Sequence, residues 1–194
     1  MIHNSYSQKY LGITSTLLAI SLLAGNGYFA KGLVSDTLTL TFVRSIIAAM
    51  FLFLFMRSQG QLVRFHSQQD LWICCFTGFL LGVHWLSFFY SMSISTVTLG
   101  MVTLYTYPVI TLWLEVVLFE KKASPWDWLI SGIVVLGVGI IASDSSGSDF
   151  NNTMAILTGL LSAFCFAARN VVQQNFLSLY PAQQTIFYQT LTIA

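Results

Sequence analysis

Six long apolar stretches follow one another along the chain, and a shorter seventh begins near its last residues. A helix rises 1.5 Å per residue, so about 20 apolar residues are needed to cross the roughly 30 Å hydrocarbon core of a bilayer. Each of the six is about that long, and short polar connections separate them. We therefore predict an all-α protein, a polytopic bundle of transmembrane helices. The predicted spans are residues 11–30, 38–56, 71–90, 97–119, 126–143 and 154–176, and the partial seventh begins at Thr185.

The composition of the chain excludes the other common classes of protein. Charged residues make up 8% of the 194 residues, against about 25% in a typical soluble domain, and 56% are hydrophobic. A disordered chain would instead be poor in apolar residues. The net charge of +1 provides no positive field for nucleic acid. The expected surroundings are a lipid bilayer, with no nucleic-acid partner.

Basic residues in the connections predict how the chain is oriented. Connections that face the cytoplasm carry an excess of lysine and arginine. One side of the predicted bundle has only Lys31, whereas the side of the N-terminus has Lys9, Arg57, Arg64, Lys121 and Lys122. We therefore expect a multi-pass protein of the cell (inner or plasma) membrane with a cytoplasmic N-terminus.

Several polar groups fall at a similar depth within the predicted spans. Counting 1.5 Å per residue from the outer ends places Arg44 and His84 about 9 Å below the surface and Asn26 about 6 Å below it. Tyr105 and Tyr107 lie about 12–17 Å down. A charge within a membrane marks the interior of a bundle or a wet cavity, so this common layer predicts a water-accessible chamber. Purely structural roles, such as hydrogen bonding to neighbouring helices, stay open for each of these side chains.

Helix-breaking residues lie near the same layer. Gly25 and Gly27 flank Asn26 in the first span, and Pro108 interrupts the fourth. Breaks of this kind free backbone groups that only protein partners or cavity water can satisfy, and they are typical of transport sites. Glu115 lies deeper, about 27 Å from the outer end and so near the cytoplasmic edge.

No residue set suited to catalysis or metal binding is found within the spans. The aspartates lie in connections or at span ends, so they complete no Ser/His/Asp set at membrane depth. Cys74, Cys75 and Cys165 have no metal-binding spacing and are interpreted as packing residues. Segment 137–142 fits a dinucleotide fingerprint on paper but lies inside an apolar helix. We expect neither an enzyme nor a cofactor or metal site.

Gly78 and Gly82 form a Gly-x-x-x-Gly pattern, which allows two helices to approach closely. The sequence does not identify the helix that fills this surface. Packing within the chain is expected, while pairing with a second copy as a homodimer stays open.

The chain also carries a weak internal repeat. A shift of 145 residues places segment 40–49 over 185–194, with Phe42 on Phe187 and Arg44 on Gln189. Five helices separate the two starts, so the second unit would enter the membrane from the opposite face. This arrangement is an inverted-topology repeat, which is a frequent architecture among transporters.

Taken as a set, these features resemble the drug/metabolite transporter superfamily, in particular its EamA-type members. The resemblance implies inverted five-helix repeats: a complete first repeat over 12–143, and a second over 154–194 that is truncated. Since family members typically carry ten helices, we expect the chain to be a fragment or a natural truncation. The residues that carry the likeness are Gly25-Asn26-Gly27 with Lys31, Arg44, the aromatic segment 84–92, Pro108, Glu120-Lys121, and Gly132 with Gly137-Val138-Gly139.

The resemblance implies a secondary carrier, acting as an exporter of small organic solutes such as amino acids or metabolites by alternating access. Arg44 and His84 would orient a polar or anionic substrate group. The expected pathway consists of Asn26, Arg44, His84, Trp85, Tyr105, Tyr107 and Arg169. Gly25, Gly27 and Pro108 would act as hinges, and Gly78, Gly82, Gly132 and Gly137 would serve helix packing. The alternative is a non-transporting membrane interaction or assembly subunit that pairs through its transmembrane helices.

Overall fold

A computed structural model describes residues 13–18, 21, 37–60, 64–145 and 150–194. The chain divides into two units, 1–34 and 35–194. In the first unit, residues 13–18 are helical, within the predicted first span. Apart from residue 21, the remainder of that span, including Gly25, Asn26 and Gly27, lies outside the described residues.

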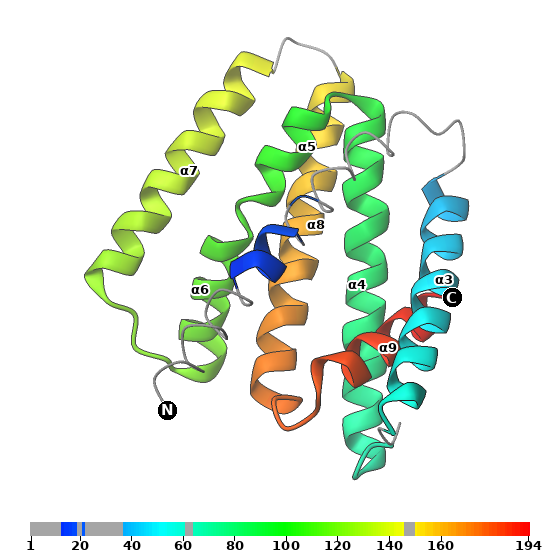
Figure 1. The fold of residues 1–194 in the computed structure, drawn as a ribbon. Coiled ribbons are helices and arrows are strands. Elements are labelled where there is room, and N and C mark those ends of the chain that lie inside the picture. The colour runs from blue at the N-terminus through cyan, green and yellow to red at the C-terminus, as the bar shows by residue number, and fades with distance from the viewer. Residues whose placement is uncertain (1–12, 19–20, 22–36, 61–63, 146–149) are drawn as a thin grey trace. The chain divides into compact units, whose positions relative to one another are not determined.

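The second unit is built from helices joined by short connections (Figure 1). No strand occurs among the described residues, which confirms the predicted all-α class and the polytopic helix bundle. Most helices begin and end within a few residues of the predicted span ends. They are α3 (Thr37–Ser58), α4 (Gln68–Ile94), α5 (Val97–Leu104), α6 (Tyr107–Phe119), α7 (Pro125–Ser145), α8 (Phe150–Phe176) and α9 (Ala182–Ile193).

Local signals in the sequence account for where helices start. The Ser67 hydroxyl accepts a hydrogen bond from the backbone N–H of Asp70 at 3.1 Å and caps α4. Thr96 caps α5 in the same way, accepting from Leu99 at 3.1 Å. Serine and threonine suit this position because their oxygens satisfy N–H groups that have no partner within the helix.

The predicted fourth span is two helices, α5 and α6, separated by a turn at Tyr105 and Thr106. Pro108 follows as the second residue of α6. Proline has no N–H to donate to the carbonyl of Leu104, and its ring would collide with that carbonyl in a continuous helix. The helix therefore stops before the proline and restarts.

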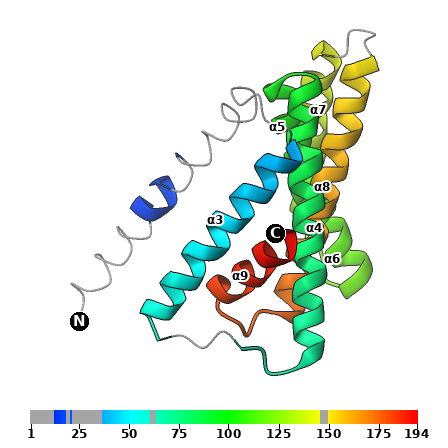
Figure 2. The same ribbon diagram turned by 90° about the vertical axis from the view of Figure 1, so that its right-hand side faces the viewer.

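Helices α4 and α8 form the most extensive contact of the second unit. The Ser91 hydroxyl on α4 joins them by donating to the carbonyl of Ala155 at 2.6 Å. Helices α5 and α6 lie along α8, whereas α7 packs mainly against α5 and α6 (Figure 1). On the other side, α9 crosses between α3 and α4 (Figure 2).

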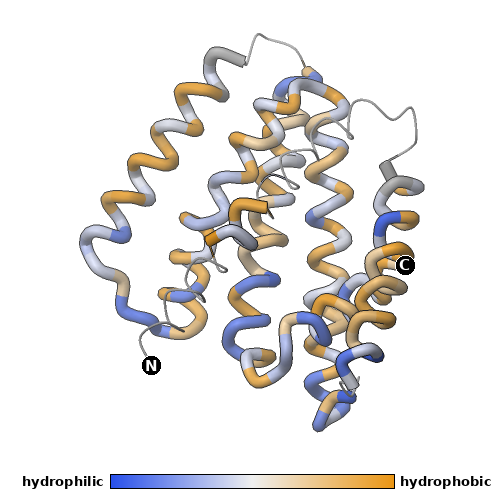
Figure 3. Tube along the Cα trace, in the orientation of Figure 1, coloured by the Kyte–Doolittle hydropathy of each residue, from blue (hydrophilic) through white to orange (hydrophobic). Residues whose placement is uncertain are grey.

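Many large apolar side chains of the helices are exposed, as a lipid environment requires. Figure 3 shows that apolar residues recur along the helices. Polar residues gather instead at the α6–α7 and α8–α9 connections. Four segments of the described chain are long and apolar enough to cross a membrane: Thr41–Ser58, Gln68–Ile94, Val97–Phe119 and Phe150–Phe176. The apolar part of α7, Pro125–Ile141, is shorter.

Candidate functional site

Helix α4 presents polar and aromatic side chains to three neighbouring helices. Thr77 and His84 are seven residues apart and so share one face, about 10 Å apart along the axis. Trp85 and Phe89 lie on an adjacent face. Three clusters form around these positions, and together they contain most of the described residues predicted for the pathway.

The first cluster is centred on His84, which is buried between α4 and α8. Its Nδ1 lies 2.8 Å from the hydroxyl of Ser162 and 3.1 Å from the Ser162 carbonyl oxygen. A protonated Nδ1 donates to the carbonyl and an unprotonated one accepts from the hydroxyl, so Ser162 holds the ring in either tautomer. Phe166 lies 4.7 Å from the imidazole and 5.0 Å from the Tyr107 ring, between centroids. The structure thus links His84 to Tyr107 through one phenyl ring.

The second cluster surrounds Arg44 on α3. Its guanidinium carbon lies 5.5 Å from the ring centroid of Trp85 and 5.2 Å from that of Phe89. Such cation–π contacts stabilise a charge where water is scarce. Arg44 is only half-buried, so its guanidinium contacts the two aromatic rings and is not fully enclosed by the protein.

A cavity of about 350 Å³ lies close to this second cluster. It is bounded by α3, α4 and the last turn of α9, and its wall includes Thr41, one turn before Arg44 on α3. The lining residues are Leu38, Thr39, Thr41, Phe42, Leu86 and Ile193.

The third cluster is a hydrogen-bond network joining α4, α8 and α9. Nη2 of Arg169 donates to Oε1 of Gln189 at 2.6 Å. Nε2 of Gln189 in turn donates to Thr77 Oγ1 at 2.9 Å and to Gln173 Oε1 at 3.0 Å. Gln189 is completely buried, so one amide fixes three helices to one another.

Other predicted site residues lie apart from these clusters. The Tyr105 side chain is 58% exposed, and Asn26 lies outside the described residues. A Cβ built on Gly132 or Gly137 of α7 meets no atom within 4 Å, whereas Gly78 and Gly82 both face α9 of the same chain.

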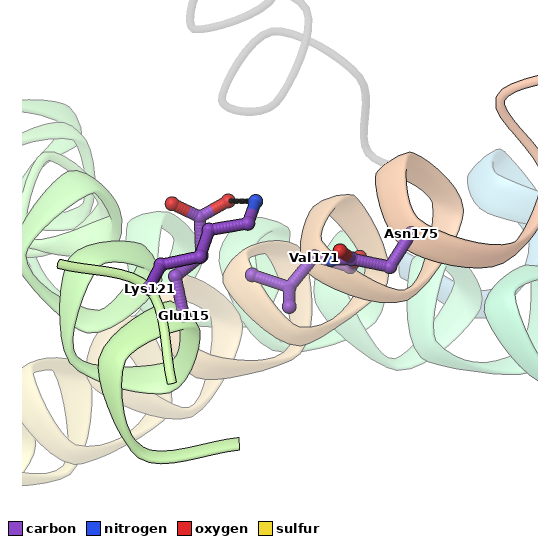
Figure 4. Close-up of polar contacts among 4 residues, drawn as sticks. All are labelled: Glu115, Lys121, Val171 and Asn175. Atoms are coloured by element: carbon purple, nitrogen blue, oxygen red, sulfur yellow. Dashed lines mark hydrogen bonds and ion pairs between the residues drawn. The ribbon is translucent and has the colours of Figure 1, made fainter. Parts of the chain in front are cut away.

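Glu115 forms an ion pair with Lys121 at the end of α6. Lys121 Nζ lies 2.8 Å from Glu115 Oε1, and the backbone N–H of Lys121 donates to the Glu115 carbonyl at 3.2 Å. Figure 4 shows this pair together with the end of α8, where Nδ2 of Asn175 donates to the Val171 carbonyl at 2.7 Å. The backbone carbonyls of Glu115 and Val171 each gain a hydrogen-bond donor in this way, near the ends of α6 and α8.

A further cluster links the start of α4 and the connection before it to the connection before α9. Oη of Tyr180 donates to Oδ2 of Asp70 at 2.6 Å and accepts from the backbone N–H of His66 at 3.1 Å. The bond to Asp70 raises the pKa of the Tyr180 phenol, because the neutral phenol is the donor. Phe65 packs edge-on against Tyr180, with ring centroids 4.7 Å apart.

In the described part of the chain, no group of three or more His, Cys, Asp or Glu side chains is arranged to hold a metal ion. The three cysteines are free thiols. Cys74 Sγ donates to the Thr185 carbonyl at 3.5 Å, a packing contact between α4 and α9.

Sequence reasoning did not select Gln189, Ser162, Phe166 or Thr77 for the site. A signal for the first was present: Thr185 and Gln189, four residues apart, place polar side chains on one face of α9, and both are buried. Ser162 and Thr77 carry no comparable signal, because single hydroxyl residues are common in membrane helices.

These features define a multi-pass membrane protein whose helix bundle holds polar side chains in its interior. Residues 10–143 match the EamA-like transporter family, and the chain belongs to that family. The match confirms the resemblance drawn from the sequence.

One curated relative is an uncharacterized transporter, YxxF, of Bacillus subtilis (strain 168). It is 24% identical over 191 residues, which cover 96% of this chain. The chain spans about 60% of the length of that relative. No solved structure matches the chain.

Proposed function

We propose that the chain forms part of a secondary carrier that exports small organic solutes, such as amino acids or metabolites, by alternating access. One observation carries this proposal: α4 contacts three clusters with polar or charged side chains, around Arg44, His84 and Arg169, inside an apolar bundle. Charges within a membrane are costly and typically mark a solute or ion pathway. Family membership and the relative's description as a transporter support the same conclusion.

In the proposed carrier, the clusters have separate tasks. Arg44, held by Trp85 and Phe89, binds a polar group of the solute beside the α3–α4–α9 cavity. His84 orients that group, with its own ring fixed by Ser162. The break between α5 and α6 leaves backbone groups outside the regular helix pattern and provides a place for bending.

The test is solute flux through the product of the intact gene in sealed vesicles. Arg44→Ala and His84→Ala are each expected to lower flux at least about tenfold, the factor that corresponds to roughly 1.4 kcal/mol of lost interaction. Arg57→Ala is the matched control, because Arg57 is an exposed arginine at the end of the same helix. Unchanged flux in both site variants would remove these residues from the pathway.

The alternative function is a non-transporting assembly subunit that pairs through its membrane helices. It relied on Gly78 and Gly82 as a surface for a second copy. Their close approach to α9 supports packing within the chain instead, so we favour the carrier.

A further inference from the structure

The guanidinium of Arg44 has no hydrogen-bond acceptor in the described part of the chain. The other arginine inside the bundle, Arg169, donates to two amide oxygens, at 2.8 and 2.6 Å. Arg44 instead contacts the rings of Trp85 and Phe89. A cation–π contact stabilises the positive charge but gives the N–H groups no acceptor. The N–H donors of Arg44 are therefore available to a ligand.

The same donors are accessible. The Arg44 side chain is half-buried, and none of its nitrogen atoms is fully enclosed without a partner. Arg44 lies one turn inside the segment Thr41–Ser58, which is long and apolar enough to cross a membrane. A charge at membrane depth typically marks a solute or ion pathway. Accessible donors at this depth are what the binding of a polar solute requires.

No carboxylate of the described residues neutralises the charge of Arg44. The one ion pair found among them joins Glu115 to Lys121 at the end of α6. Asp70 and Asp127 lie in the first turns of α4 and α7, where each accepts a hydrogen bond. An anionic partner for Arg44 is therefore favoured, and the described residues do not supply it.

Two rings of α4 hold the guanidinium in place. Trp85 and Phe89 are four residues apart, so they lie on one face of the helix. Their ring centroids are 5.5 and 5.2 Å from the guanidinium carbon of Arg44. Phe89 is buried and packs on Phe88, with ring centroids 5.5 Å apart, so its own position is fixed. A cation that is held in advance loses less conformational freedom when a ligand binds.

The chemistry of this cluster selects the ligand. A guanidinium has parallel N–H groups that match the two oxygens of a carboxylate. It supplies a single positive charge, which balances a monoanion and leaves a dianion uncompensated. The aromatic rings beside it favour an organic anion with an apolar part over a strongly hydrated inorganic ion.

We propose that Arg44, positioned by Trp85 and Phe89, binds the carboxylate of a small organic monoanion. The inference rests on the proposed carrier function, in which Arg44 binds a polar group of the solute, and it names that group and its charge. The apolar part of the solute lies beside the Trp85 ring, which is partly exposed.

The experiment uses the full chain, purified in a neutral detergent, with sodium isobutyrate as the probe and isobutyramide as its neutral isostere. Saturating isobutyrate is expected to raise the thermal midpoint by about 2 °C or more relative to sodium chloride at equal ionic strength. Isobutyramide has no charge to pair with Arg44 and is expected to give no such rise. Equal shifts with the two compounds, or no shift with isobutyrate, would overturn the anion site.

Variants assign the shift to Arg44. Arg44→Gln is expected to abolish it, and Arg44→Lys to retain part of it, because lysine keeps the charge without the planar fork. Trp85→Leu is expected to reduce the shift, since it keeps the arginine but removes one of the rings that position it. Arg57→Gln, at an exposed arginine of the same helix, is the matched control and should keep the full shift. A full shift in Arg44→Gln would contradict the proposal; if that variant does not fold, a full shift in Trp85→Leu would contradict it.

A lipid headgroup is the competing source of an anion, because a phosphodiester is also a monoanion with two free oxygens. Dimethyl phosphate, a water-soluble phosphodiester, is therefore compared with isobutyrate at the same concentration. Isobutyrate is expected to give the larger shift. A larger shift with dimethyl phosphate that is lost in Arg44→Gln would assign Arg44 to lipid headgroups and overturn the solute site.

Flux measurements separate this inference from the carrier proposal. Solute flux in sealed vesicles that isobutyrate does not inhibit would overturn the anion site and leave the carrier. Isobutyrate binding that requires Arg44, in a protein without flux for any carboxylate tested, would support the anion site and remove the carrier.

Discussion

A Cβ built on Gly78 of α4 would lie 2.9 Å from the Cα of Gln189 on α9. The absence of a side chain at Gly78 is therefore what allows α9 to cross α4 at this distance. The same approach brings the Gln189 amide within 2.9 Å of Thr77 and so completes the network that holds Arg169. A close helix crossing and a polar network thus depend on one glycine.

Gly78→Ala is expected to destabilise the fold by about 1–3 kcal/mol, because the added methyl meets backbone, which cannot rotate away. Gly132→Ala is the matched control, since its Cβ would meet nothing within 4 Å. That variant should be neutral or more stable by up to about 1 kcal/mol, as alanine favours helix. Thermal denaturation in detergent, followed by the helical circular dichroism signal, measures both. A Gly78→Ala protein as stable as the Gly132→Ala protein would contradict the close crossing.

The hydroxyl of Ser162 is expected to matter to stability because it holds a buried imidazole. Ser162→Ala removes the 2.8 Å contact to Nδ1 of His84 and should cost about 1–3 kcal/mol, as expected when a buried polar partner is lost. Ser93→Ala is the control: its exposed hydroxyl donates to the carbonyl of Tyr90 within the same helix. The difference between the two denaturation midpoints is the measurement. Identical midpoints would show that His84 does not need the Ser162 hydroxyl, because the backbone carbonyl at residue 162, 3.1 Å from Nδ1, is still there in the variant.

Helix positions could be predicted from the sequence because their determinants are local. The span predicted over 38–56 is α3, and that over 154–176 lies within α8, since apolar length and capping residues are read from neighbouring positions. The break in the fourth span was predicted at Pro108, but the turn lies at Tyr105 and Thr106. The reason is that proline cannot donate to the carbonyl four residues before it and its ring collides with that carbonyl, so the helix ends before the proline itself.

The site itself could be predicted only in part. Arg44, His84 and Arg169 are conspicuous as polar residues in apolar spans. Their partners depend on which helices pack together, and that information is spread over the whole chain. Ser162 and Gln189 lie 78 and 112 residues from the α4 side chains that they contact. Only the tertiary fold brings such pairs together.

The Tyr180–Asp70 contact predicts a pH dependence at the alkaline end. The pKa of Tyr180 is raised above its ordinary value of 10.0 in the folded protein, so its hydrogen bond contributes fully below about pH 10. The contribution is lost as the pH rises through the folded pKa, where the phenol ionises beside a carboxylate. Tyr180→Phe should therefore be less stable than the wild type at pH 8, and the gap should narrow above about pH 10.

Thermal midpoints of the two proteins between pH 8 and pH 11.5, about one and a half units past the phenol's ordinary pKa, provide the measurement. All other titratable groups are the same in both proteins, so the difference between the two midpoints isolates Tyr180. Tyr90→Phe, at an exposed tyrosine of α4, is the control. A gap that stayed constant across the range would rule out the bond to Asp70 as its source.

The contact between Arg44 and Trp85 is best tested by a double-mutant cycle. Arg44→Met, Trp85→Leu and the double variant are expected to give a coupling energy of about 0.5–2 kcal/mol, the range measured for cation–π pairs from exposed to desolvated sites. Arg57 and Trp113, on α3 and α6, provide a reference cycle with the same two substitutions and no cation–π contact between them. That cycle should be additive within about 0.3–0.5 kcal/mol.

Phe89 also contacts the guanidinium at 5.2 Å, so part of the stabilisation of Arg44 survives in Trp85→Leu. The coupling energy measured with Trp85 is therefore expected to be smaller than the total stabilisation of Arg44 by both rings. Additivity of the Arg44–Trp85 cycle would mean that the contact between the two side chains contributes no measurable free energy to stability.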